Sequence, residues 1–155
     1  MLRSDVLRKR RFGAAPESAL PPEGYAPEVT EAVYRELCDR AATALRAGYS
    51  AIIDAVALRP EERNAFASVA RECGVPFTGL WLDAPGATMA ARIGTRRGDA
   101  SDATSAILEQ QLTRDAGPLD WVRIAAGTGP DATLAAAHRA IAAGPSAGIA
   151  VPPAG

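Results

Sequence analysis

The segment YSAIIDAVALRP, residues 49–60, contains an apolar run that carries a carboxylate and is followed by a proline. The run AIIDAVA has the length and composition of a buried strand, and Asp54 lies in its carboxyl half. Pro60 is typical of the first turn of a helix. A buried strand followed at once by a helix predicts one unit of a layered α/β domain.

The same alternation continues on both sides of this segment. Strands are expected at residue 2, 49–57, 76–85 and 121–127, and helices at 6–12, 28–47, 60–73, 86–97, 105–115 and 131–143. Parallel strands joined by right-handed crossovers form a three-layer α/β/α domain, which we expect over residues 1–143. The low-complexity segment GPSAGIAVPPAG, residues 144–155, predicts a disordered tail.

Composition limits the possible partners. The chain has 155 residues, 48% of them hydrophobic and 23% charged, with a formal net charge of -1. This balance gives no overall field that recruits nucleic acid or an anionic membrane. No apolar run approaches the roughly 20 residues of a membrane span, and Met1 is not followed by a signal peptide. We therefore expect a cytoplasmic protein with neither nucleic acid nor membrane as a partner.

The cysteines and the histidine do not suggest a metal site. Cys38 and Cys73 lie on amphipathic helical patterns, which favours buried free thiols over a disulfide. His138 is the only histidine, and it flanks the apolar stripe of the last helix, so we expect it at the surface. One histidine without a cysteine cluster excludes a zinc site.

Acidic and basic side chains are expected together at one edge of the sheet. Asp5, Asp54 and Asp83 each follow an apolar strand segment, and ligands of parallel sheets bind beyond the carboxyl ends of the strands. Arginines of the following helices are expected near the same edge: Arg8, Arg59, Arg63 and Arg92. Carboxylates that hold a metal and guanidinium groups that hold oxygens suit a magnesium–phosphate ligand. An N-cap of the next helix is an equally good interpretation of Asp83.

The segment ARIGTRRGDASDAT, residues 91–104, combines a helix end with a polar loop. Arg92, Arg96 and Arg97 lie on the helical part, and Thr104 is a candidate N-cap for the helix that follows. Such a segment can close over phosphates and bring arginines to the charge that develops during transfer. The alternative is a helix C-terminus enriched in arginine by the helix dipole. The basic run from Arg8 to Arg11 has a similar alternative, a solvated helical face.

Together these segments resemble the P-loop kinase-like ATP-binding proteins of the gluconate-kinase and zeta-toxin class. The resemblance is carried by LRSDVLRKR (2–10), AIIDAVALRPEER (51–63), FTGLWLDAP (77–85), ARIGTRRGDASDAT (91–104) and QQLTRDAGPLDW (110–121). It extends from Leu2 to about Ile141 and is strongest to an ATP-binding domain often fused behind an aminoglycoside-phosphotransferase-like domain. It implies a P-loop NTPase-like fold, Mg²⁺ and ATP as cofactors, and phosphoryl transfer to a small-molecule acceptor.

The resemblance also implies roles for individual residues. Asp5 corresponds to a carboxylate near the acceptor hydroxyl and is the candidate general base. Asp54 is the candidate metal ligand, and Arg8 and Arg59 are candidate substrate-binding residues. The lid arginines would contact ATP phosphates, Arg92 as a binding residue and Arg96 and Arg97 as catalytic residues. Gly127 and Thr128 follow the last strand, where adenine rests in such folds.

The sequence departs from this family at one decisive point. Family members begin with a strand and a G-x-x-x-x-G-K-[ST] loop, whose amides, lysine and hydroxyl hold the phosphates and Mg²⁺. No such motif occurs in the 155 residues, and the sole lysine, Lys9, has no glycine-rich loop before it. The sequence thus starts at the end of the family's second strand. We expect a groove between the strands at 50–56 and 77–82, where the family's first strand lies, with exposed apolar edges that favour aggregation or a partner.

Three interpretations follow from this departure. The favoured one is a truncated family member whose natural polypeptide extends upstream. The second is a split arrangement, in which an upstream phosphotransferase-like or P-loop segment on another chain completes the domain. The third is a degenerate, non-catalytic binding domain. In all three we expect the 155-residue chain alone neither to bind ATP tightly nor to transfer phosphate, and the acceptor stays open.

Overall fold

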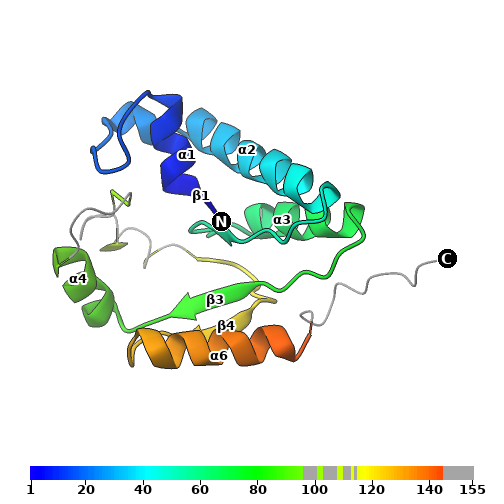
Figure 1. Cartoon of the computed structure of the whole chain (residues 1–155). Coiled ribbons are helices and arrows are strands. Elements are labelled where there is room, and N and C mark those ends of the chain that lie inside the picture. Colours follow the sequence, from blue (N-terminus) through cyan, green and yellow to red (C-terminus); the bar gives the residue numbers. More distant parts are fainter. Residues whose placement is uncertain (96–100, 103–107, 110–112, 114, 145–155) are drawn as a thin grey trace.

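The structure, a computed structural model, describes residues 1–95, 101–102, 108–109, 113 and 115–144. Strands and helices alternate along the chain (Figure 1). In order they are β1 (Leu2–Arg3), α1 (Ser4–Arg11), the short 3₁₀ helix η1 (Pro22–Tyr25), α2 (Pro27–Arg46), β2 (Ile53–Asp54), α3 (Pro60–Glu72), β3 (Leu80–Asp83), α4 (Gly86–Thr95), β4 (Val122–Ala125) and α6 (Pro130–Ala142). The α/β class expected from the sequence is confirmed, and it is consistent with a P-loop NTPase fold.

The strands are parallel but much shorter than the apolar runs that contain them. β1 pairs with β2 through Leu2↔Ile53 and Arg3↔Asp54, and β3 pairs with β4 over four residues. The sequence predicted a strand over 49–57, yet only two of those residues form a ladder. The reason is that the partner strand β1 has only two residues before α1 begins at Ser4, which limits the length of the ladder.

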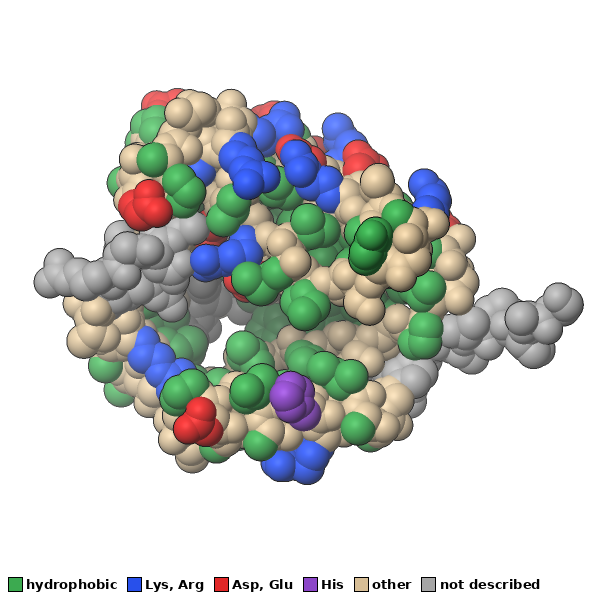
Figure 2. Space-filling view, in the orientation of Figure 1, with side chains coloured by type: hydrophobic (Ala, Val, Ile, Leu, Met, Phe, Trp, Pro, Cys, Tyr) green, Lys and Arg blue, Asp and Glu red, His purple; other side chains and the backbone are tan. Residues whose placement is uncertain are grey.

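The sheet is divided into two halves that face each other across a hollow. One half is β1–β2 and the other is β3–β4. A cavity of about 1020 Å³ is lined by residues of β2 and β3, and Figure 2 shows a hollow through this face of the molecule. Asp54 and Asp83, at the carboxyl ends of these strands, both line it. Ala51 and Thr78, at the amino ends, both line a second apolar cavity of about 390 Å³. The two strands therefore run in the same direction, and the predicted groove between them is confirmed.

The hydrophobic core belongs mainly to the first half. Val33 and Leu37 of α2 are fully buried against Leu7 of α1 and Phe66 of α3. Tyr34 stacks on Phe66 with ring centroids 5.7 Å apart. In the second half α6 packs on β4 but has no buried residue of its own. The apolar stripe of α6 thus faces the hollow without being covered.

One buried arginine ties the two halves together. Arg63 of α3 is 3% exposed, and its guanidinium lies over the Trp81 ring of β3, 5.7 Å from the centroid. Its nitrogens donate at 2.6–3.0 Å to four carbonyl oxygens, two after β2 and two before β4: Ala57, Leu58, Ala116 and Pro118. The sequence placed Arg63 near the ligand edge. Two of its partners, Ala57 and Leu58, do follow the carboxyl end of β2, but every contact of its guanidinium in the described structure is with this internal network.

The structure also tests the expectations for the cysteines and the histidine, and in part those for the C-terminal region. Cys38 and Cys73 are free thiols as predicted, although both are half-buried rather than buried. His138 is exposed, as predicted. The predicted N-cap Thr104 and most of the helix at 105–115 lie outside the described residues, as does the predicted tail apart from Gly144. Within the described chain no helix combines the length and apolar character needed to cross a membrane.

We expect Arg63→Met to lower the free energy of unfolding by about 2–4 kcal/mol, because it removes the donor of four buried or partly buried hydrogen bonds to carbonyl oxygens. Arg71→Met, on the same helix, is the matched control. Arg71 is exposed and bonds only the Ser68 hydroxyl among the described contacts, so its replacement should change stability by less than about 0.5 kcal/mol. Urea unfolding followed by tryptophan fluorescence measures both. Equal effects of the two substitutions would contradict the role of Arg63.

Candidate functional site

The carboxyl ends of β1 and β2 bring two acids to one edge of the sheet. Asp54 ends β2, and the parallel register sets it beside Arg3, two residues before Asp5. Asp5 and Asp54 are close enough for the charge of Asp54 to act on the pKa of Asp5. The sequence therefore predicted correctly that these two carboxylates share an edge.

Asp5 is the acid whose environment suits a proton acceptor. Burial raises the pKa of its carboxyl above the ordinary value, and the nearby charge of Asp54 adds to the rise. The Arg8 guanidinium and a hydrogen bond from Ser101 act in the opposite direction and only partly offset burial. A carboxylate with a raised pKa accepts a proton more readily than an exposed one, which is the property a general base needs.

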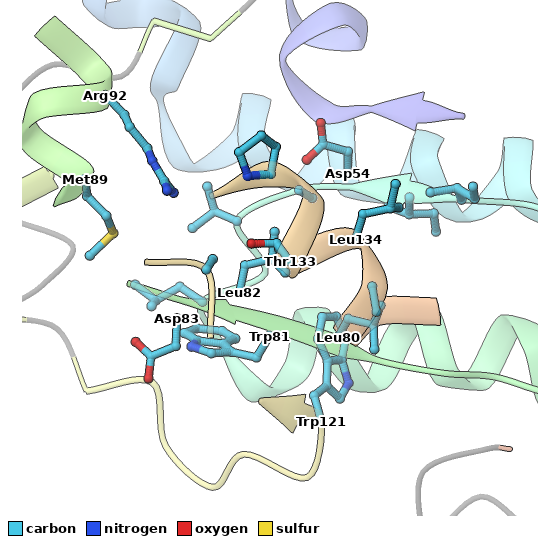
Figure 3. Close-up of a pocket in the computed structure, with 18 of the residues that line it drawn as sticks. Asp54, Leu80, Trp81, Leu82, Asp83, Met89, Arg92, Trp121, Thr133 and Leu134 are labelled. Atoms are coloured by element: carbon cyan, nitrogen blue, oxygen red, sulfur yellow. The ribbon is translucent and has the colours of Figure 1, made fainter. Parts of the chain in front are cut away.

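Asp54 and Arg92 face the cavity between the half-sheets. Both line it, Asp54 from β2 and Arg92 from α4, and Figure 3 shows their side chains reaching toward the same space. The Asp54 carboxylate accepts a hydrogen bond from Arg3 Nε at 3.0 Å. Asp83 ends β3, and its carboxylate pairs with Arg123 at 3.4 Å. Of the acids after the strands, Asp54 is thus the one that shares the cavity with a cation on the opposite wall.

These residues fit magnesium and ATP incompletely. Mg²⁺ at phosphate sites is held by one or two carboxylates together with phosphate oxygens and water, so Asp54 can supply one ligand. Across the described residues no group of three or more His, Cys, Asp or Glu side chains is assembled. The backbone cradle is missing as well, since the sequence contains no phosphate-binding loop. The described residues therefore hold the acids and a cation of a phosphate site without its anchor.

Arg8 has a structural role that the sequence did not reveal. Its Nη1 donates to the Gly24 carbonyl at 2.8 Å and to the Thr30 hydroxyl at 3.2 Å, and the guanidinium lies 5.0 Å from the centroid of the Tyr25 ring. These contacts fasten η1 to α1 and α2. Its Nε is buried and has no hydrogen-bond partner in the described part of the chain. A substrate-binding role for Arg8 stays a prediction.

The other residues proposed to bind substrate or nucleotide are Arg59, Gly127 and Thr128, and the structure describes the surroundings of each. Arg59 is exposed and pairs with Glu62 at the start of α3, where the Glu62 hydrogen bond raises its pKa. Gly127 and Thr128 are exposed in the turn between β4 and α6, whose flanking residues Ala126 and Gly129 line the cavity. Arg96 and Arg97 lie outside the described residues. The roles of all of them stay predictions.

A polar cluster around Lys9 was missed by sequence reasoning. Lys9 is 1% exposed, and its Nζ donates to the Asp102 carboxylate at 2.8 Å and to the Pro16 carbonyl at 2.7 Å. The same carboxylate accepts hydrogen bonds from the Leu20 amide at 3.1 Å and from the Tyr25 hydroxyl. The cluster ties residues beyond α4 to the loop after α1. The signal was present, because a single lysine in an arginine-rich chain suggests a position that needs a compact ammonium.

Comparison with known proteins identifies the family. A family model described as an AAA domain matches residues 1–118. The chain belongs to this AAA domain family of P-loop NTPases. The family implies ATP binding, use of Mg²⁺, and a kinase-like function, which confirms the coarse resemblance seen in the sequence. The narrower likeness to the gluconate-kinase and zeta-toxin class stays a prediction. No curated protein matches the chain.

Asp5 and Asp102 should respond to pH in opposite directions. The fold raises the pKa of Asp5, so its neutral form is favoured, and the stability that this form contributes is lost as the pH rises through the folded-state pKa. Burial also works against the charge of Asp102, but the Lys9 and Tyr25 hydrogen bonds outweigh it and lower the pKa. The contribution of Asp102 is therefore present at neutral pH and lost as the pH falls through its folded-state pKa.

We expect Asp5→Asn to stabilise the protein at pH 7 and to have little effect near pH 3. Asp102→Asn should destabilise it at pH 7, with a difference that shrinks near pH 3. Urea unfolding of the wild type and both variants at the two pH values measures this. Effects of the same sign at pH 7 would contradict the assignment of the two environments.

Proposed function

We propose that this chain forms the acceptor side and the lid side of an ATP-dependent kinase that phosphorylates a small molecule. In this proposal the phosphate cradle comes from a P-loop segment outside the 155 residues. The observation that carries it is that Asp54 lies beside Asp5 at one edge of an interrupted sheet and lines the same cavity as Arg92. Membership of the AAA domain family adds ATP as the expected phosphoryl donor.

Each proposed role follows from the chemistry of the residue. Asp5 accepts the proton of the acceptor hydroxyl, which its raised pKa favours. Asp54, whose carboxylate pairs with Arg3, would hold Mg²⁺ through one of its oxygens. Arg92 binds phosphate oxygens from the opposite wall, and Arg96 and Arg97 follow it in the sequence as candidates for the transferred charge. Arg8 and Arg59 are proposed for the acceptor, and Gly127 and Thr128 for the adenine.

A non-catalytic partner domain is the second candidate. It is supported by the engagement of two site residues in internal contacts, since Asp54 pairs with Arg3 and Arg8 is bonded to η1 and α2. In this alternative the chain forms one complete domain together with another polypeptide, and that domain does not transfer phosphate. The DNA upstream of Met1 separates the cases: an in-frame G-x-x-x-x-G-K-[ST] supports one longer kinase, a separate adjacent frame supports a split protein, and neither supports the degenerate domain.

The isolated chain should show no low-micromolar binding of Mg-ATP by calorimetry. The amides and the lysine of a phosphate-binding loop provide several charge-assisted hydrogen bonds, each worth about 1.5–3 kcal/mol, and the chain lacks them. An N-terminal extension that encodes a strand, the loop and a helix should restore Mg-dependent binding, and replacing the added lysine by alanine should abolish it. Low-micromolar binding by the unextended chain would show that other residues build the phosphate site.

In the extended protein, Asp5→Asn should lower kcat by about 10²–10⁴-fold and leave ATP affinity nearly unchanged, because a general base acts in the transition state. Asp39→Asn is the matched control, since Asp39 is an exposed aspartate of α2 outside the residues that line the cavity. Steady-state kinetics with a panel of hydroxyl acceptors measures the effect. A loss of ATP affinity at unchanged kcat would contradict the role given to Asp5.

A further inference from the structure

Two polar residues of the segment 91–104 have no role in the proposed function. Ser101 and Asp102 lie next to each other and belong to no helix or strand. Both contact α1: Asp102 pairs with Lys9, 93 positions earlier, and Ser101 hydrogen-bonds Asp5. Asp5 and Lys9 are four residues apart in α1, so they lie one above the other on the same side of the helix. One face of α1 therefore meets both residues of the pair.

Among the described residues, three donors hold the Asp102 carboxylate. Its Oδ1 accepts a hydrogen bond from Lys9 Nζ at 2.8 Å. Its Oδ2 accepts one from the Leu20 amide at 3.1 Å and one from the Tyr25 hydroxyl. These donors come from α1, from the loop after it and from η1. Because its two oxygens are bonded to different parts of the fold, the orientation of the side chain and of the backbone that carries it is restricted.

The donors that hold Asp102 are themselves fixed by other contacts. Lys9 is 1% exposed, and its Nζ also donates to the Pro16 carbonyl at 2.7 Å. The Tyr25 ring packs against the Arg8 guanidinium, whose Cζ lies 5.0 Å from the ring centroid. Lys9 and Tyr25 thus give the Asp102 carboxylate partners with a defined position.

The contacts of Asp102 are in place before Asp5 loses its proton. Burial works against the charge of Asp102, but the hydrogen bonds from Lys9 and Tyr25 outweigh it and lower the pKa. Burial, followed by the hydrogen bond to Asp102, raises the pKa of Tyr25, so its hydroxyl stays protonated. Burial raises the pKa of Asp5. As the pH rises, Asp102 is therefore charged and bonded before Asp5 ionises.

We propose that Asp102 is a positioning residue, which holds Ser101 against the Asp5 carboxylate so that this carboxylate keeps one orientation. One oxygen of Asp5 is occupied by the Ser101 hydroxyl, which leaves the other oxygen for the proton of an acceptor hydroxyl. The inference rests on the proposed function for the role of Asp5 as a base, and it adds two residues that orient this base. Ser101 contacts the base, and Asp102 acts through Ser101.

The pKa of Asp5 separates positioning from a simple effect of charge. Burial raises this pKa, and Arg8 and the hydrogen bond from Ser101 partly offset the rise, so loss of that bond raises the pKa further. Removing the negative charge of Asp102 would by itself lower the pKa of Asp5, because a like charge nearby disfavours the ionised form. The two explanations therefore predict opposite signs for Asp102→Asn.

The other ionisable groups that face Asp5 come from four elements: Arg3 of β1, Arg8 of α1, Asp54 of β2 and Tyr25 of η1. Their charges are the same in every variant described below, since the Tyr25 hydroxyl is neutral while Asp5 titrates. A change in the pKa of Asp5 then reports on Ser101 and Asp102 alone.

The test uses the 155-residue chain without nucleotide and follows the Asp5 carboxyl carbon by ¹³C NMR as the pH is varied. Ser101→Ala should raise the pKa of Asp5. Asp102→Asn should raise it as well, although it removes a negative charge, and the double variant should raise it no further than Ser101→Ala alone. Asp39→Asn, at an exposed position of α2, is the matched control and should leave the pKa unchanged.

Two milder variants guard against a loss of the fold when Asp102 is replaced. Tyr25→Phe removes one hydrogen bond from the Asp102 carboxylate, keeps an aromatic ring against Arg8 and changes no charge. It should raise the pKa of Asp5 by less than Asp102→Asn does. Ser101→Thr retains a hydroxyl and should keep the pKa close to that of the wild type.

Kinetics of the extended protein give a second readout. Ser101→Ala and Asp102→Asn should each lower kcat by about tenfold, and the double variant should lower it by about the same factor, because both act on one carboxylate. The affinity for Mg-ATP should not change, since the orientation of the base affects only the transfer step. Ser101→Thr should retain the wild-type kcat, which a loss of fold stability alone would not explain.

The outcomes are distinct. A lower or unchanged pKa of Asp5 in Asp102→Asn would overturn the proposal, as would shifts that add in the double variant. If Asp102→Asn does not fold, Tyr25→Phe decides, and an unchanged pKa of Asp5 in that variant overturns the proposal. The expected pKa shifts, found together with an extended protein that transfers no phosphate, would remove the proposed function alone. Transfer with a kcat unaffected by Ser101→Ala would remove the positioning role alone.

Discussion

The contact of the Arg63 guanidinium with four carbonyl oxygens holds the structure together across its interrupted sheet. A continuous sheet would link its halves through backbone hydrogen bonds, and here that link is absent between β2 and β3. The planar, multi-donor guanidinium suits this position, because it bonds carbonyls from both halves and stacks on Trp81 at the same time. The carbonyl of Ala57 accepts one of these hydrogen bonds. Ala57 has a positive φ of 44°, and its backbone N–H donates a hydrogen bond to the Tyr34 hydroxyl.

A second tie operates on the other side of the candidate site. Lys9 is buried and its partner Asp102 is partly buried, so removing Asp102 would leave the buried charge of Lys9 uncompensated. Ser101, the neighbour of Asp102, donates a hydrogen bond to Asp5. Two adjacent residues therefore have different roles: Asp102 stabilises the fold by pairing with Lys9, and Ser101 contacts the candidate base Asp5. Asp102 is held in its charged form, whereas Asp5 is held in an environment that opposes its charge.

The interruption also accounts for features that look unrelated. It leaves Ile52 and Leu82 exposed, although each belongs to an apolar run typical of a buried strand. The interruption also separates Asp54, at the end of β2, from Asp83, at the end of β3. The cavity between them therefore reaches the edge of the sheet where a phosphate ligand would bind.

The sequence by itself determined the α/β alternation and the parallel direction of the strands, because hydrophobic period, proline positions and acids at strand ends are local signals. The groove and the family were expected from the resemblance of whole segments to the P-loop kinase-like proteins. The sequence also placed Asp5 and Asp54 together, since register follows from parallel pairing. Only the tertiary structure decided what each cation does. Arg8, Arg63 and Arg92 follow strands or lie on helices in similar local patterns, yet one fastens a 3₁₀ helix, one bridges two half-sheets and one faces the cavity. Their partners are carbonyls and side chains distant in the sequence, and no local pattern encodes which of these comes within reach of a long, flexible side chain.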